Sequence, residues 1–369
     1  MSLYSEQSCI GKLLSLGPFE QPSQELDWLF LNAIKESIRH QIEIEPVFSR
    51  WISSTGTNID DLTRIEDVPY FPASIFKLIK FSSAKNITRT LQSSGTTSQL
   101  KSTIHLDLET SRRQTKALTQ ILAALLGSSR RPFLIFDAEP RVKTSDVSLS
   151  ARVAGMSGYL MAAKSRNFVG RSLENTVELD RDALFRALEQ YETSKSPPVI
   201  IGYTFMIHKL MLEGGIDLCG KLPIGTSLIH FGGWKKLKDK KIPKAEFNKR
   251  LNVITGISIN QIFDIYGFTE QLGAVYPSIG NSPAKVPTYS RVIVRDPTNL
   301  KVITDGREGL LQFLSPIPNS YPGQSILNDD IGTGSVNTTS YCNEFWVHER
   351  PEKAISRGCG DTLPKDFYL

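Results

Sequence analysis

Two short segments combine residue types that suit nucleotide phosphate chemistry. The first is a polar loop that consists of Ser93, Ser94, Gly95, Thr96 and Thr97. Hydroxyls and backbone N–H groups in such a loop donate hydrogen bonds to phosphate oxygens, and the glycine lets the backbone approach closely. The G-x-x-x-x-G-K-[ST] spacing of a Walker loop is absent. The alternative is therefore a plain polar surface turn.

The second segment, residues 266–270, reads Tyr-Gly-Phe-Thr-Glu and follows the apolar run at residues 261–265. If that run is a strand, Tyr266, Thr269 and Glu270 emerge together at its carboxyl end, where ligands bind in α/β sheets. The alternative is a turn at Gly267 with an exposed glutamate. The occurrence of both segments in one chain favours a nucleotide site over either alternative.

Alternating apolar runs and amphipathic stretches predict the scaffold that positions these segments. Four runs are typical of buried strands, at residues 132–136, 198–201, 227–231 and 261–265. Helical periodicity is present at residues 23–38, 108–126, 180–193, 205–213 and 244–254. This alternation is typical of an α/β fold with a mainly parallel sheet.

The chain changes character after Pro287. Short strands are predicted at residues 291–295, 301–303 and 309–314, separated by turn residues. We therefore expect an α/β core at residues 1–287, a β-rich subdomain of the same large domain at 288–332, and a short C-terminal segment at 333–369.

Composition excludes several classes of function. The chain has 369 residues, and its 43 basic and 38 acidic residues give a net charge of +5, too weak for a nucleic-acid footprint. No apolar run reaches membrane-spanning length and no signal peptide precedes Cys9, so we expect a soluble, cytoplasmic protein. The four cysteines are scattered without a C-x-x-C pair, which disfavours a zinc site and a disulfide framework. Among them, Cys219 is expected to be a small buried residue.

Both motifs, in this order, resemble those of the acyl-adenylate-forming superfamily, which read close to [ST]-[ST]-G-T-[ST]-G-x-x-K and Y-G-x-T-E. One position departs, because Ser98 stands where that superfamily usually has glycine. Within the superfamily the chain looks most like acyl-protein synthetases of the LuxE type, and more distantly like phenylacetate-CoA ligases. Four segments carry this resemblance, at residues 71–77 (Phe-Pro-Ala-Ser-Ile-Phe-Lys), 230–236 (His-Phe-Gly-Gly-Trp-Lys-Lys), 330–332 (Asp-Ile-Gly) and 357–359 (Arg-Gly-Cys).

The resemblance implies a large adenylate-forming domain that binds ATP, and it assigns roles to the motif residues. Residues 93–97 would hold the ATP phosphates, with Thr97 among the catalytic residues. Thr269 would contact the α-phosphate, and Glu270 would help to hold Mg²⁺, a cation that prefers carboxylate oxygens.

The same resemblance assigns the nucleoside contacts. Gly232 and Gly233 would line the adenine with backbone, and Tyr266 would pack against its ring. Asp330 would accept hydrogen bonds from the ribose hydroxyls. Arg350 would be a further ribose contact, although its surroundings match the hinge pattern of the family poorly.

The C-terminal residues bear on where the acyl group goes next. Residues 331–369 are too few for the mobile domain that an ordinary member of the superfamily carries after this aspartate. Cys359 lies between two glycines with Arg357 nearby, a context that favours an accessible thiolate. We therefore expect self-acylation at Cys359 and delivery to a partner protein, a reductase or a carrier protein. The alternatives are a ligase that acylates coenzyme A or a carrier protein directly, and a non-catalytic nucleotide-binding protein.

The resemblance implies a fatty acid as the carboxylic acid substrate. Tyr203, Phe205 and His208 follow a predicted strand and are candidates for its pocket. An apolar helix start in the core has the same appearance.

Overall fold

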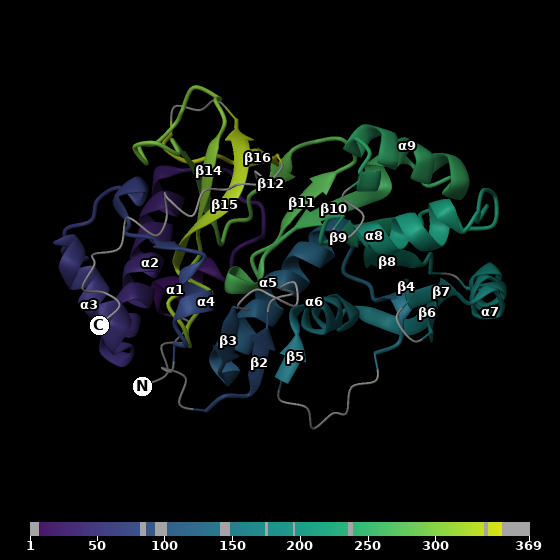
Figure 1. Ribbon diagram of the computed structural model, residues 1–369, viewed down its shortest axis with the longest axis horizontal. Helices are drawn as coiled ribbons and strands as arrows, with labels where there is room; N and C mark the ends of the chain where they lie inside the picture. The colour runs from purple at the N-terminus through teal and green to yellow at the C-terminus, as the bar shows by residue number, and fades with distance from the viewer. Residues whose placement is uncertain are drawn as a thin grey trace.

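The computed structural model describes residues 7–81, 86–92, 102–140, 148–173, 176–194, 196–234, 239–335 and 339–348 (Figure 1). The α-helices are α1 (Cys9–Leu13), α2 (Gln24–Ile44), α3 (Pro46–Thr55), α4 (Ile75–Leu78), α5 (Leu108–Leu126), α6 (Ala151–Leu160), α7 (Arg181–Glu192), α8 (Thr204–Ile207) and α9 (Lys244–Thr255). A π-helical turn at His208–Glu213 continues α8.

The larger sheet contains 13 strands in the described part of the chain, and its central part is parallel. The strands of this part are β10 (Ile262–Tyr266), β9 (Ser227–Phe231), β8 (Val199–Tyr203), β4 (Arg131–Ala138) and β6 (Ala163–Leu173), in that spatial order. Every residue of β8 and β9 is buried, as expected for strands covered on both faces. The predicted α/β fold with a mainly parallel central sheet is confirmed.

Antiparallel strands extend the same sheet on both sides. β7 (Thr176–Leu179) pairs with β6 at one edge. Beyond β10 lie β11 (Tyr276–Ile279), β12 (Ala284–Lys285), β16 (Glu344–Val347), β15 (Ser325–Gly334), β14 (Gly309–Leu314) and β13 (Arg291–Arg295). β1 (Phe71–Pro72) pairs in parallel with β15. The predicted strand at 301–303 is only an isolated bridge from Val302 to Arg295. The proposed domain boundaries stay a prediction.

A second, smaller sheet lies beside α5 and α6, below the main sheet in Figure 1. Its strands are β3 (Thr103–Leu106), β2 (Arg89–Gln92) and β5 (Ser148–Ser150), in the order β3-β2-β5. The polar loop at residues 93–97 follows β2 directly, but it lies outside the described residues.

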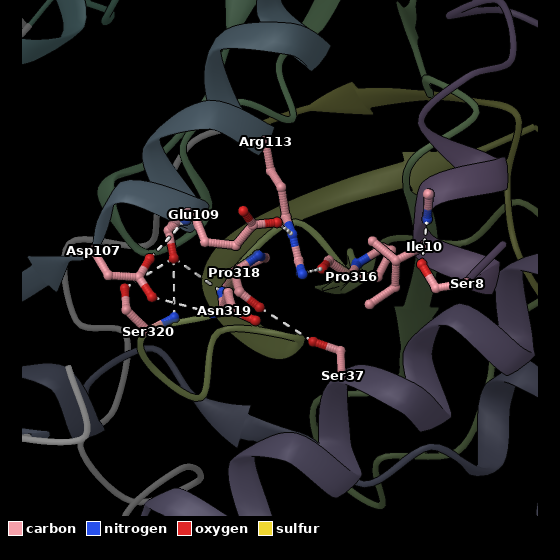
Figure 2. Close-up of polar contacts among 12 residues, drawn as sticks. Ser8, Ile10, Ser37, Asp107, Glu109, Arg113, Pro316, Pro318, Asn319 and Ser320 are labelled. Carbon is pink, nitrogen blue, oxygen red and sulfur yellow. Dashed lines mark hydrogen bonds and ion pairs between the residues drawn. The ribbon is translucent and has the colours of Figure 1, made fainter. Parts of the chain in front are cut away.

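The chain between β14 and β15 is fixed against two long helices (Figure 2). The Ser37 hydroxyl on α2 donates a hydrogen bond to the Pro318 carbonyl at 3.1 Å. On the α5 side, the Asn319 amide group donates to the Asp107 carboxylate at 3.1 Å, and the Ser320 backbone N–H donates to the Thr110 hydroxyl at 2.9 Å. Asp107 also caps α5, because its carboxylate accepts from the Thr110 N–H. These bonds set the position from which β15 begins.

None of the helices among the described residues has the length and apolarity that crossing a bilayer requires.

Candidate active site

The two loops that the sequence singled out after β9 and β10 emerge at one edge of the main sheet. β9 and β10 are parallel neighbours, with Phe231 opposite Ile265. The glycine pair Gly232 and Gly233 follows β9 directly, and residues 266–270 begin at the last residue of β10. Parallel strands deliver their carboxyl ends to the same edge, which is why two segments more than 30 residues apart in sequence come together.

Tyr266 and Asp330 are joined directly. The Tyr266 hydroxyl donates a hydrogen bond to Oδ2 of Asp330 at 2.7 Å. Asn328 Nδ2 donates to the Tyr266 hydroxyl at 3.0 Å and to the same Asp330 oxygen at 3.2 Å. Two donors to the same carboxylate oxygen restrict the orientation of Asp330.

The Tyr266 ring is held by aromatic neighbours from the antiparallel strands. It stacks on Phe313 with ring centroids 5.6 Å apart and an interplanar angle of 25°. Phe345 meets it edge-on at 5.9 Å. Packing of the ring and bonding of the hydroxyl together leave Tyr266 little rotational freedom. Its contact with adenine remains a prediction.

The turn that carries Thr269 and Glu270 is anchored by the next residue. Gln271 Nε2 donates to the carbonyl oxygens of Phe313 at 3.0 Å and Gly323 at 2.8 Å. Gly323 lies so close that a Cβ there would be 2.8 Å from the Glu270 carbonyl oxygen. Glu270 is 8 % exposed. Burial, followed by the charge of Glu270, raises the pKa of the nearby Tyr321, so that hydroxyl stays protonated at neutral pH.

A cavity of about 290 Å³ adjoins this turn. Gly232 and Thr269 line it at the motif loops, and Tyr203 lines it from the end of β8. Most of the other lining side chains are apolar, and they come from α5, α6, the small sheet, the ends of β9 and β10 and the segment that follows β10: Leu91, Leu106, Leu118, Tyr159, Met161, Phe231, Ile265, Phe268, Leu272 and Val275. A mostly apolar cavity with a few polar groups is the usual form of a small-molecule site.

Gly232 is required by both conformation and space. Its φ is +80°, and a Cβ there would lie 2.7 Å from Cδ1 of Tyr203. Gly233 also has a positive φ, +66°, but nothing lies within 4 Å of the corresponding Cβ position. The first glycine thus lets Tyr203 pack against the loop, whereas the second is required by backbone conformation alone.

Residues 93–97, Arg350 and Cys359 lie outside the described residues. Of the three pocket candidates after β8, Tyr203 lines the cavity, whereas Phe205 and His208 are not among its lining residues. The expectation of a buried Cys219 is wrong, because this residue is exposed in a surface turn where its N–H donates to the Asp217 carboxylate.

Sequence reasoning missed several residues of the site. Asn328 precedes Asp330 by two positions on β15, so the period of a strand places both side chains on one face. The spacing of two residues could therefore have indicated from the sequence that Asn328 lies beside Asp330. Gly155, Gly158 and Tyr159 line the cavity from α6, a helix that was not predicted.

The sequence matches the family model described as "Acyl-protein synthetase, LuxE" over residues 3–368. It is 26% identical to a long-chain-fatty-acid–luciferin-component ligase of Aliivibrio fischeri, over 74% of this chain and 71% of that protein. It is 25% identical to the protein of the same name from Vibrio harveyi, over 88% of this chain and 84% of the relative.

Among solved structures, a 2-hydroxyisobutyryl-CoA ligase in complex with 2-HIB-AMP and CoA superposes with a TM-score of 0.64 at 14% identity. The match covers 89% of this chain and 74% of that chain. At this low identity, the structural similarity shows that the chain has the fold of adenylate-forming ligases.

Proposed function

The chain belongs to the LuxE family of acyl-protein synthetases, and we propose that it activates a fatty acid with ATP at the site beside β9 and β10 and then carries the acyl group on Cys359. Activation of a carboxylic acid as an acyl-AMP is the activity that family membership supports. The identity of the acid, the role of each residue and the route of the acyl group belong to the proposal.

One observation carries the proposal. Polar groups suited to a nucleotide and an apolar cavity suited to an acyl chain meet at the same turn. Thr269 lines the cavity, and Tyr266, three residues earlier, holds Asp330 at 2.7 Å. An acid bound in the cavity would therefore present its carboxylate beside the nucleotide.

The chemistry requires positioning more than covalent help. A carboxylate oxygen attacks the α-phosphorus of ATP, the bond from that phosphorus to the bridging oxygen breaks, and pyrophosphate leaves. Thr269 and the loop at 93–97 would donate hydrogen bonds to the phosphate oxygens as charge develops. Asp330 would bind the ribose hydroxyls, and Tyr266 and Asn328 would keep it in place. Gly232 and Gly233 would line the adenine.

Glu270 is the proposed metal ligand. No cluster of three or more His, Cys, Asp or Glu side chains able to hold a metal occurs among the described residues. Mg²⁺ at a nucleotide site typically takes only one or two protein carboxylates, with the rest of its ligands from phosphates and water. A single buried glutamate on this turn fits that requirement. The bound cation would neutralise phosphate charge.

The acyl group is then transferred within the protein. The Cys359 thiol loses its proton, the thiolate attacks the acyl carbon, and the bond from that carbon to the AMP oxygen breaks. A thioester and AMP result. Arg357 would favour the thiolate by its charge. The thioester would pass to a cysteine or other thiol of a partner protein, a reductase or a carrier protein.

Acid-dependent exchange of labelled pyrophosphate into ATP tests the activation step. We expect exchange with long-chain acids in the presence of Mg²⁺. Absence of exchange with every fatty, aromatic and short polar acid, despite measurable ATP binding, would favour the non-catalytic alternative.

The cysteine assignment needs a separate experiment. Protein incubated with ATP, Mg²⁺ and radiolabelled acid should gain a hydroxylamine-labile label, and Cys359→Ser should abolish it while leaving pyrophosphate exchange intact. Cys219→Ser is the matched control, because Cys219 is exposed and is not a residue of the cavity lining. Equal labelling of Cys359→Ser and the parent protein refutes the assignment. AMP release that requires added coenzyme A would support the direct ligase instead.

A further inference from the structure

Helix α6 presents Gly155, Gly158 and Tyr159 to the cavity. Positions spaced by three and four residues share one face of a helix. Glycine weakens a helix interior relative to alanine, and neither glycine has the positive φ that would require it. A Cβ at 158 would lie 3.2 Å from Cδ2 of Leu118, and a Cβ at 155 would lie 3.5 Å from the Tyr203 hydroxyl. The two glycines therefore keep side chains out of the space beside these cavity residues.

Tyr159 adds a polar group to the same wall. It is 6 % exposed, and its ring packs on Phe231 with centroids 4.6 Å apart. Its hydroxyl makes no hydrogen bond to any residue that the structure describes. Burial raises the pKa of Tyr159, so the hydroxyl is protonated at neutral pH and can donate. Because Tyr159 lines the cavity, its hydroxyl is a candidate donor to a ligand bound there.

Tyr203 lies between the glycine loop after β9 and the α6 glycines. A Cβ at Gly232 would meet its ring carbon Cδ1, whereas a Cβ at Gly155 would meet its hydroxyl. The ring thus separates the proposed nucleotide loop from α6 by roughly the length of a tyrosine side chain. If the carboxylate of a bound acid lies near Thr269, as the proposed function requires, its acyl chain would extend past Tyr203 towards Gly155 and Gly158.

We propose that the acyl chain of the substrate carries a hydroxyl or oxo oxygen that accepts a hydrogen bond from Tyr159, in a subsite walled by Gly155 and Gly158. This inference rests on the proposed function, because it takes the acyl chain to occupy this cavity. It narrows the substrate class from fatty acids in general to chains with an oxygen substituent.

Calorimetric titration of the full-length protein tests the proposal without requiring catalysis. The probes are dodecanoic acid and its hydroxy and oxo derivatives of equal chain length, with the oxygen at different carbons. We expect at least one derivative to bind about fivefold more tightly than the plain acid, the usual contribution of one neutral hydrogen bond. Tyr159→Phe should remove this preference and leave the affinity for dodecanoic acid unchanged.

Tyr191→Phe is the matched control, because the Tyr191 hydroxyl accepts a hydrogen bond from Asn167 at 2.8 Å and is not part of the cavity lining. This variant should keep the preference. Gly158→Ala should weaken plain and oxygenated acids alike, because Leu118 must shift; unchanged affinities would refute the role of the glycines.

A wild-type preference below twofold for every derivative, a preference that survives Tyr159→Phe, or no binding of any of these acids overturns the proposal. Pyrophosphate exchange separates it from the proposed function. Pyrophosphate exchange with dodecanoic acid, without tighter binding of any oxygenated derivative, would refute only the proposed subsite. A preference for an oxygenated acid that depends on Tyr159, without pyrophosphate exchange, would refute the proposed activation of the acid and support the subsite.

Discussion

Removal of the Tyr266 hydroxyl is the sharpest perturbation that the site offers. Tyr266→Phe keeps the ring on Phe313 and deletes one oxygen, which donates to Asp330 at 2.7 Å and accepts from Asn328 at 3.0 Å. Asp330 keeps its bond from Asn328 at 3.2 Å. The carboxylate should therefore stay near its place but lose part of its orientation.

The magnitude follows from the type of bond that is lost. A hydrogen bond to a charged group contributes about 1.5–3 kcal/mol, and neutral ones about 1 kcal/mol. Because Asp330 retains its bond from Asn328 and is only half-buried, we expect a loss of about 1–2 kcal/mol in nucleotide binding, or about 5- to 30-fold in KM for ATP. KM for the acid should change less, because Tyr266 is not among the residues that line the cavity.

Pyrophosphate exchange at varied ATP provides the assay, and Tyr276→Phe is the matched control. Tyr276 belongs to the same aromatic cluster, and its hydroxyl is hydrogen-bonded to Ser290 at 2.6 Å, away from Asp330. The control should lose about 1 kcal/mol of unfolding free energy and keep the parental KM for ATP. An unchanged KM for ATP in Tyr266→Phe, or an equal rise in both variants, would refute the assignment of Tyr266 and Asp330 to the nucleotide.

Two further predictions concern the glycine loop and a buried histidine. Gly232→Ala should impair exchange much more than Gly233→Ala, because both alter a positive φ but only the first brings a Cβ within 2.7 Å of Tyr203; equal losses in the two variants would exclude the steric role. Burial lowers the pKa of His230 in the folded protein. Between that lowered pKa and the ordinary value of about 6.5, the unfolded chain therefore binds more protons than the native protein. The free energy of unfolding should rise with pH in this range and level off above about 6.5. Urea unfolding between pH 5 and pH 8 should show this slope, and His230→Gln should reduce it; a slope of opposite sign or an unaffected one would contradict the burial argument.

The sequence predicted the parallel part of the sheet well because its strands are almost wholly apolar. The run at 227–231 coincides with β9, and the helix at 108–126 coincides with α5. β6 was missed because most of its residues are only half-buried or exposed, with polar side chains such as Lys164 and Arg166. α6 was missed because its glycines weaken the helical pattern, and those glycines lie in the cavity wall.

Local sequence motifs predicted some residues of the site and not others. The segment at 266–270 could be placed at a strand end, because strand period and turn chemistry are both local properties. The bond between Tyr266 and Asp330 spans 64 positions, and no local pattern predicts such a contact. The resemblance to a family supplied Asp330, and the strand period could have indicated Asn328 from it, whereas Tyr159 required the fold.

Transfer of oxygen from acid to nucleotide tests the central claim most directly. A fatty acid labelled with ¹⁸O in its carboxylate is incubated with the protein, ATP and Mg²⁺ until AMP has formed, and the AMP is examined by mass spectrometry. Attack of the carboxylate on the α-phosphorus predicts that one labelled oxygen appears in AMP. Unlabelled AMP, or the formation of ADP and phosphate instead, would contradict activation through an acyl-AMP.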